Sequence, residues 1–337
     1  RAFHEGALAK DSSAGVEAAL ETDEEGDNST YQHVTIHSDY AHVSWGNLEP
    51  QVEKGERWMI KEINSVSISV EIQFLVRCKG EENDTDLYQA KEYFRVRHAA
   101  DQGATYLLDY DRTMEQIFDP TRQVLSENGI LLGVTDADVS YMVNGDGEVV
   151  SFVTAGELWN YNKTTDEASL LFSFMNTENT DERNLVRQHK IRILSVDEEG
   201  NTMFAVYGYM NRGEHEGEVG AAVYSYDISQ NSVEEKVFVS IDKGYAQAVK
   251  ELDKIMYYSA SRDVLYTMMD GMLYEYTLEK NLSRTVVEGL TEGQYAVSAD
   301  GRLVGYQADG DVNTATTLKI MNLENGKEWE ISCGENE

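Results

Sequence analysis

The chain has 337 residues and a formal net charge of −33, from 28 Lys and Arg against 61 Asp and Glu. A surface this acidic repels phosphate backbones and anionic lipid headgroups, so nucleic acid is not an expected partner. Hydrophobic residues make up 41% of the chain, with 20 Tyr, 9 Phe and 4 Trp, which excludes a largely disordered protein. The length predicts either one repeat array or two domains.

Residues 1–30 differ from the rest of the chain. They hold two basic and eight acidic side chains, many small residues and few large apolar ones. This composition predicts an acidic tether that is either flexible or carries a short helix. The chain contains no run of 18 apolar residues and begins at Arg1 without Met, so we expect that an anchor or signal segment precedes it.

From Tyr31 onward the sequence has the period-2 alternation and the β-branched and aromatic runs of β-strands. Residues 66–78 and 88–98 are the clearest examples. Two interpretations of residues 31–100 stay open: they supply the first one or two sheets of a repeat array, or they form a small separate β domain. The first interpretation is preferred.

Five short segments share an aliphatic residue that leads into a strand ending in Asn, Asp or Thr. They are 106–111, 157–162, 222–227, 272–277 and 317–322. Aligned on Leu107, Leu158, Val223, Leu273 and Leu318, their spacings are 51, 65, 50 and 45 residues. Four of the segments follow a second recurring element, a turn and an apolar strand, at 144–153, 197–209, 260–269 and 298–307.

The repeated unit is therefore a four-stranded meander. Such a sheet cannot cover both of its faces alone, and radial packing of several sheets buries them while it protects their edges. The prediction is an all-β fold: a β-propeller of four-stranded antiparallel blades, about five to seven in number, over residues 31–337.

The last repeats, at 295–307 and 318–331, resemble TolB-type and WD40-like propellers, although they lack the Trp-Asp dipeptide of WD40 repeats. The resemblance covers roughly residues 100–337. Taken whole, the chain also resembles uncharacterised membrane-anchored extracytoplasmic proteins of Gram-positive anaerobic bacteria. This second resemblance implies an extracytoplasmic or cell-surface location, with an anchor N-terminal to the sequence.

Signatures of catalysis are absent from the sequence. It has no GxSxG elbow and no GxxxxGK[ST] phosphate loop, so no nucleotide or other cofactor is expected. The two cysteines, Cys78 and Cys333, are too far apart for a metal-ligand pair. They form either one long-range disulfide or, as we expect, two buried thiols.

Two groups of residues were weighed as metal ligands. Acidic side chains alternate at Asp136 and Asp138 and again from Asp309 to Asn313, but neither run continues as an EF-hand loop, which favours turns. His33, His37 and His42 have a spacing that suits a transition metal if His33 and His37 share one strand face. Structural roles are preferred for all three, and no metal is expected.

The segment 207–220 adds length to the longest repeat, and inserted loops on one face of a repeat array often bind ligands. Arg212 suits a carboxylate, His215 belongs to the residue type whose charge can change near neutral pH, and Tyr209 can stack on a sugar or an aromatic ring. Asn211 and Glu218 complete the candidate binding set. The alternative is a solvated hairpin in which Arg212 pairs with Glu214 or Glu216.

These features favour a non-catalytic extracytoplasmic binding or scaffold module that recognises a protein or glycan partner through loops on one propeller face. A glycan-active hydrolase or lyase, with carboxylates at the central channel, is the first alternative, and perturbed acids around a deep axial pocket would favour it. A sensory ectodomain that binds a small ligand is the second alternative.

Overall fold

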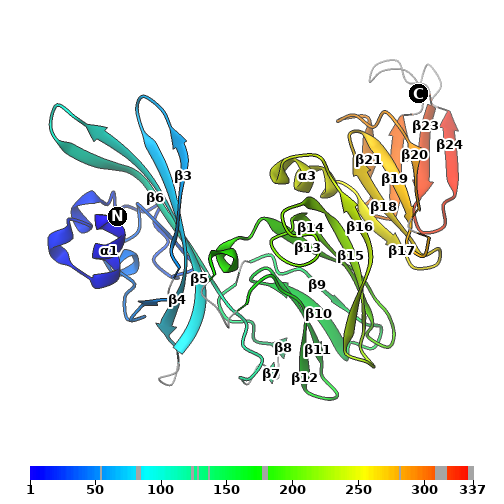
Figure 1. The fold of residues 1–337 in the computed structure, drawn as a ribbon, viewed down its shortest axis with the longest axis horizontal. Helices are drawn as coiled ribbons and strands as arrows, with labels where there is room; N and C mark the ends of the chain where they lie inside the picture. Colours follow the sequence, from blue (N-terminus) through cyan, green and yellow to red (C-terminus); the bar gives the residue numbers. More distant parts are fainter. Residues whose placement is uncertain are drawn as a thin grey trace. The chain divides into compact units, whose positions relative to one another are not determined.

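The structure is a computed structural model that describes all residues other than 54, 81–84, 123–124, 127–128, 136, 177–180, 281, 308–316 and 333–337. The chain divides into two compact units. Unit 1 comprises residues 1–139 and 173–186, and unit 2 comprises residues 140–172 and 187–337. Figure 1 shows the elements of both units.

Unit 1 is built on a six-stranded sheet in the order β1-β6-β5-β4-β2, with β3 also paired to β4. Its strands are β1 (His33–Thr35), β2 (Gln51–Val52), β3 (Arg57–Ile63), β4 (Ile68–Lys79), β5 (Thr85–Ala99) and β6 (Ala104–Gln116). Two short strands, β7 (Leu125–Ser126) and β8 (Gly129–Ile130), pair with each other. The unit's helices are α1 (Ala2–Ala9) and α2 (Tyr40–Val43), with 3-10 turns at Ser12–Ala14, Glu17–Ala19 and Glu182–Leu185.

Residues 1–30 are packed against this sheet, in contrast to the expected tether. Ala7 and Val16 are almost fully buried and belong to the same apolar cluster as Phe74 of β4. Small residues allow the close approach: a Cβ added to Gly6 would lie 2.3 Å from the Cβ of Ala14. The helix therefore joins a core with few large apolar side chains of its own.

Residues 31–100 contribute β1 to β5 to the unit 1 sheet. None of the four meanders of unit 2 contains them, and unit 1 extends beyond them to residues 1–139 and 173–186. The long strands β4 and β5 pair along the whole of Ile68–Lys79. This pairing explains the period-2 alternation of apolar and polar residues in 66–78 and 88–98.

Unit 2 consists of four antiparallel meanders in which each strand pairs with the next in the chain. Blade 1 comprises β9 (Tyr141–Val143), β10 (Val149–Thr154), β11 (Glu157–Asn162) and β12 (Glu167–Phe172); blade 2 comprises β13 (His189–Val196), β14 (Thr202–Tyr209), β15 (Val219–Asp227) and β16 (Ser232–Ser240). Blade 3 comprises β17 (Met256–Ser259), β18 (Val264–Met269), β19 (Met272–Thr277) and β20 (Leu282–Val287); blade 4 comprises β21 (Tyr295–Val297), β22 (Leu303–Gln307), β23 (Thr317–Asn322) and β24 (Glu328–Ser332). Helix α3 (Tyr245–Leu252) lies between blades 2 and 3 in the chain.

The predicted repeats coincide with these blades. Four of the aromatic segments are the third strands, β11, β15, β19 and β23, and the turn-and-strand elements end in the second strands, β10, β14, β18 and β22. The fifth segment, 106–111, lies in β6 of unit 1. The described residues of unit 2 therefore form an all-β propeller fold with four blades, whereas the sequence predicts about five to seven.

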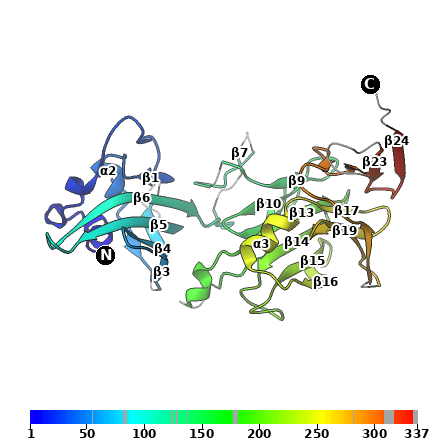
Figure 2. The same cartoon turned by 90° about the horizontal axis from the view of Figure 1, so that it is seen from above.

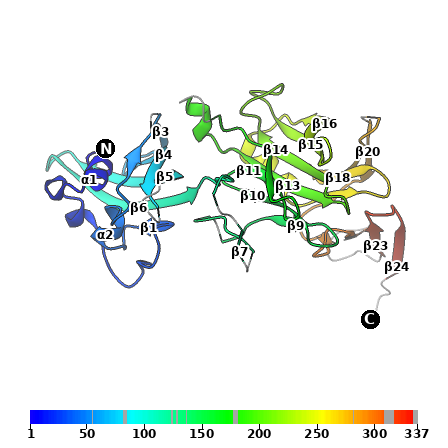
Figure 3. The same cartoon turned by 90° about the horizontal axis from the view of Figure 1, so that it is seen from below.

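Consecutive blades are joined by polar contacts. Ser151 of blade 1 bonds Thr202 of blade 2 at 2.8 Å, and Arg192 of blade 2 donates to the carbonyl of Met256 in blade 3 at 3.3 Å. Ser259 of blade 3 donates to the carbonyl of Glu324 in blade 4 at 2.7 Å. Figures 2 and 3 show the blades following one another in chain order from green to red.

The long repeat spacing has two sources. The hairpin between β14 and β15 has nine residues, 210–218, whereas the connections β10–β11 and β18–β19 have two each. In addition, residues 173–186, between blades 1 and 2, belong to unit 1. The prediction named the segment 207–220 as one source of extra length and did not include residues 173–186. No helix among the described residues has the length and apolar character needed to cross a membrane.

Candidate functional site

The hairpin Met210–Glu218 is a closed, ordered turn. Met210 N–H donates to the carbonyl of Glu218 at 2.8 Å, and Gly217 N–H donates to the carbonyl of Met210 at 2.9 Å. Gly213 and Gly217 have φ values of 91° and 93°, which side chains other than glycine rarely adopt. The turn therefore depends on glycine at these two positions.

His215 attaches the hairpin to the outer strand of its own blade. Its imidazole stacks on the ring of Phe238 of β16, with the centroids 3.7 Å apart and the planes 7° from parallel. Its Nε2 lies 2.8 Å from Oε1 of Glu235, also on β16. His215 thus holds the loop against β16.

The other predicted binding residues lie on or beside the same hairpin and differ in exposure. Asn211 is buried at the base of the hairpin, with 3% of its surface exposed. Tyr209 and Arg212 are partly exposed, and Glu218 is exposed. The exposed acids of the turn are Glu214, Glu216 and Glu218. The sequence analysis named only Glu218 of these for binding, although their alternation in the sequence is the signal that indicates an acidic surface.

The three histidines weighed as metal ligands do not come together. Strand β1 ends at Thr35, so His33 and His37 do not share a strand. His33 Nε2 lies 2.5 Å from a carboxylate oxygen of Asp111, and His42 Nδ1 lies 2.9 Å from a carboxylate oxygen of Asp39. Each of these two histidines therefore has its own acidic neighbour.

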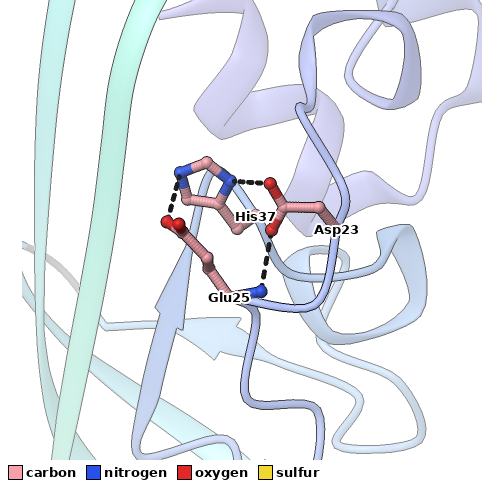
Figure 4. A group of neighbouring side chains, drawn as sticks. All are labelled: Asp23, Glu25 and His37. Carbon is pink, nitrogen blue, oxygen red and sulfur yellow. Dashed lines mark hydrogen bonds and ion pairs between the residues drawn. The ribbon is translucent and has the colours of Figure 1, made fainter.

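His37 instead lies between two carboxylates, Asp23 and Glu25, as Figure 4 shows. Its Nδ1 is 3.0 Å from Oδ2 of Asp23, and its Nε2 is 3.8 Å from Oε2 of Glu25. One ligand atom from each of the three residues lies within 4.8 Å of the others. Sequence reasoning missed this cluster because it treated residues 1–30 as a tether.

Backbone contacts hold the acidic loop against the histidine. Glu21 N–H donates to the carbonyl of Ile36 at 3.0 Å, and Asp23 N–H donates to the carbonyl of His37 at 3.2 Å. A Cβ added to Gly26 would lie 2.3 Å from the carbonyl oxygen of His37. The backbone at Gly26 thus lies so close to the backbone of His37 that only glycine fits at this position.

Several other predicted features lie partly outside the described residues. This holds for Asp136, for the run from Asp309 to Asn313, and for Cys333.

Cys78 is a free thiol in the core of unit 1, and burial raises its pKa to about 12. A thiol held protonated in this way is a poor nucleophile.

Glu275 is a buried acid on blade 3, with 6% of its surface exposed. It accepts hydrogen bonds from Tyr266 at 2.6 Å, Arg262 at 3.1 Å and Arg284 at 2.9 Å. Burial raises the pKa of Glu275, but these hydrogen bonds outweigh burial and the net pKa is lowered. A general acid needs the opposite shift.

No protein-family model matches this chain, and no curated protein matches it. Among solved structures it is similar to the β-propeller domain of the Trilobed protease from Pyrococcus furiosus, at 10% identity over 80% of this chain and 70% of that chain, with a TM-score of 0.32. It is also similar to the WD40 domain of SCAP from fission yeast, at 10% identity over 84% and 58% of the two chains, with a TM-score of 0.34.

A third similar structure is an oligogalacturonate lyase in complex with manganese, at 7% identity over 86% of each chain, with a TM-score of 0.28. Identities and TM-scores at this level assign no activity. The assignment of an all-β propeller fold rests on the four meanders of unit 2 and on their polar contacts with one another.

Proposed function

We propose that this chain is a non-catalytic binding module that recognises a basic segment of a protein partner through the hairpin Met210–Glu218. The observation that supports the proposal most strongly is that the hairpin is held by the stack of His215 on Phe238 while Glu214, Glu216 and Glu218 are exposed. A loop that is ordered before binding loses less conformational entropy when it binds.

Charge favours a protein segment over a neutral glycan. Three acids alternate within five residues of the turn, and the whole chain carries a formal charge of −33. A field of this sign attracts cationic side chains and raises association rates at low ionic strength. The expected extracytoplasmic location is part of the proposal and rests on the sequence resemblance alone.

Neutralising the three hairpin acids is expected to weaken binding. We expect the variant Glu214→Gln, Glu216→Gln, Glu218→Gln to lose affinity for basic peptides by roughly tenfold, because each exposed charge pair contributes a few tenths to 1 kcal/mol. Binding of wild type and variant to an array of peptides of varied charge, at two salt concentrations, measures the loss. The salt dependence should also decrease in the variant.

The matched control removes three exposed acids from the connections β19–β20 and β20–β21, through Glu279→Gln, Glu288→Gln and Glu292→Gln. It changes the net charge equally, so equal losses in the two triple variants would mean that the hairpin has no special role. A glycan array tests the competing ligand class on the same proteins. Preferential binding of glycans, or binding of acidic ligands that Arg212→Ala abolishes, would contradict the proposal.

Weakening the support of the hairpin is expected to affect the same binding. His215→Ala keeps all three acids but removes the stack on Phe238 and the contact with Glu235. We expect a several-fold faster dissociation from basic peptides, because the free loop then has to be ordered on binding. Surface plasmon resonance measures the rate, and an unchanged rate would show that preorganisation of the loop is not used.

A further inference from the structure

The hydrogen-bond partners of His37 determine its neutral tautomer. Nδ1 lies 3.0 Å from a carboxylate oxygen of Asp23 and 3.1 Å from the carbonyl oxygen of Glu21. Both neighbours are acceptors, so Nδ1 carries the hydrogen and donates it. In the neutral imidazole the lone pair is therefore on Nε2.

The lone pair of Nε2 faces a second carboxylate. Oε2 of Glu25 lies 3.8 Å from Nε2 of His37, on the side of the ring away from Asp23 (Figure 4). A cation between two facing acceptors, either a proton or a metal ion, can interact with both of them.

We propose that His37 Nε2 and the carboxylate of Glu25 bind one divalent transition-metal ion of the Zn²⁺ class. Zinc binds imidazole nitrogen at about 2.0–2.1 Å and carboxylate oxygen at about 2.0–2.2 Å. At a tetrahedral angle the two ligand atoms would be about 3.3 Å apart, so the observed gap of 3.8 Å needs to close by only a fraction of an ångström. Water molecules complete the coordination.

Asp23 acts as a positioning residue in this site. Its hydrogen bond to Nδ1 orients the imidazole and increases the basicity of Nε2, as carboxylates behind metal-bound histidines do. The other oxygen of Asp23 accepts the N–H of Glu25 at 2.8 Å. One carboxylate therefore fixes both the ring of His37 and the backbone of the second ligand.

The nearby histidines lack this arrangement. His33 has Asp111 at Nε2, and His42 has Asp39 at Nδ1, whereas His37 has a carboxylate beside each ring nitrogen. His33→Gln is thus a control for His37→Gln, since it removes one exposed imidazole from the same segment without changing the proposed ligands.

Titration with ZnCl₂ tests the site by isothermal calorimetry at neutral pH. We expect wild type and His33→Gln to bind one Zn²⁺ with the same affinity, and His37→Gln and Glu25→Gln to lose at least tenfold in affinity. Asp23→Asn should lose less than His37→Gln, because the amide oxygen still accepts from Nδ1. Binding should weaken in acid as the proton competes for Nε2, in the field of Asp23 and Glu25.

The absorption spectrum of bound Co²⁺ gives a second readout, and a thermal unfolding curve without metal shows that each variant is folded. A Co²⁺ spectrum that His37→Gln changes and His33→Gln does not change would support the site. No saturable Zn²⁺ binding by wild type, an equal loss in His33→Gln, or equally tight binding of Mg²⁺, which prefers oxygen ligands, would overturn the proposal.

Discussion

Replacing His4 with Gln is expected to lower the free energy of unfolding of unit 1 by about 3 kcal/mol. His4 of α1 and Glu92 of β5 are each 1% exposed, and His4 Nδ1 lies 2.5 Å from Oε2 of Glu92. The hydroxyl of Tyr110 donates to the other oxygen of Glu92 at 3.0 Å. Without the imidazole, Glu92 would keep a buried negative charge that one neutral hydroxyl cannot compensate.

The pH dependence of this contribution follows from the charge of His4. Burial lowers the pKa of His4, but the hydrogen bond and the charge of Glu92, together with Glu56, outweigh burial and the net pKa is raised above 6.5. A histidine whose pKa is raised by folding makes its full contribution to stability at any pH below the pKa of the unfolded chain. This contribution is lost as the pH rises through the pKa of the folded state. Wild type should therefore lose stability above about pH 6.5, and His4→Gln should lack this slope.

Urea unfolding as a function of pH measures the effect, and hydrogen exchange of peptides from residues 1–20 localises it to α1. A double-mutant cycle with Glu92→Gln isolates the interaction of the pair. Arg1→Ala is the control, since Arg1 and Glu5 form an exposed pair on the same helix. Full protection of residues 1–20 in His4→Gln would show that the pair does not attach the helix.

The blades could be predicted because each blade is formed by one continuous stretch of the sequence. Each blade is four consecutive strands joined in chain order, so a turn followed by an aromatic strand repeats with the blade. The segment 106–111 has the same alternation but pairs within the unit 1 sheet. Alternation shows that a strand has one buried face, and it does not show to which sheet the strand belongs.

The packing of residues 1–30 was missed for a different reason. The composition of residues 1–30 shows few large apolar residues, but α1 packs through the small residues Gly6 and Ala7 and the buried His4 as well as through Phe3 and Leu8. The contact of Asp23 and Glu25 with His37 depends on how an irregular loop closes, which no spacing in the sequence encodes. In the hairpin, the sequence could not show that His215 stacks inward on Phe238.

Lowering the pH is expected to destabilise unit 2 through His189. This residue begins β13 of blade 2, and its Nε2 donates to the carbonyl oxygen of Gly156 in blade 1 at 3.0 Å. Burial, together with the positive charge of Arg187, lowers the pKa of His189 to about 4, although the bond to Gly156 opposes the shift. The folded state therefore holds the imidazole neutral while the unfolded chain takes up a proton near pH 6.5.

The pH dependence of stability expected from His189 is opposite in sign to that expected from His4. A histidine whose pKa is lowered by folding costs no stability at a pH above the pKa of the unfolded chain. As the pH falls from about 6.5 toward 4, the free energy of unfolding decreases by at most ~3 kcal/mol. His189→Gln keeps an N–H for Gly156 and cannot be protonated, so its unfolding free energy should change less over this range. Urea unfolding, with hydrogen exchange in β13, measures the difference.

His33→Gln serves as the control for His189→Gln, because His33 is exposed and lies in unit 1. It should leave the acid dependence of β13 unchanged, and an equally steep slope in His189→Gln would show that other groups control acid unfolding. His189 lies in unit 2 and His4 lies in unit 1. Unit 2 should therefore lose stability as the pH falls, and unit 1 should lose stability as the pH rises. Acid should therefore expose β13 before α1 loses its protection, and alkali should expose α1 first.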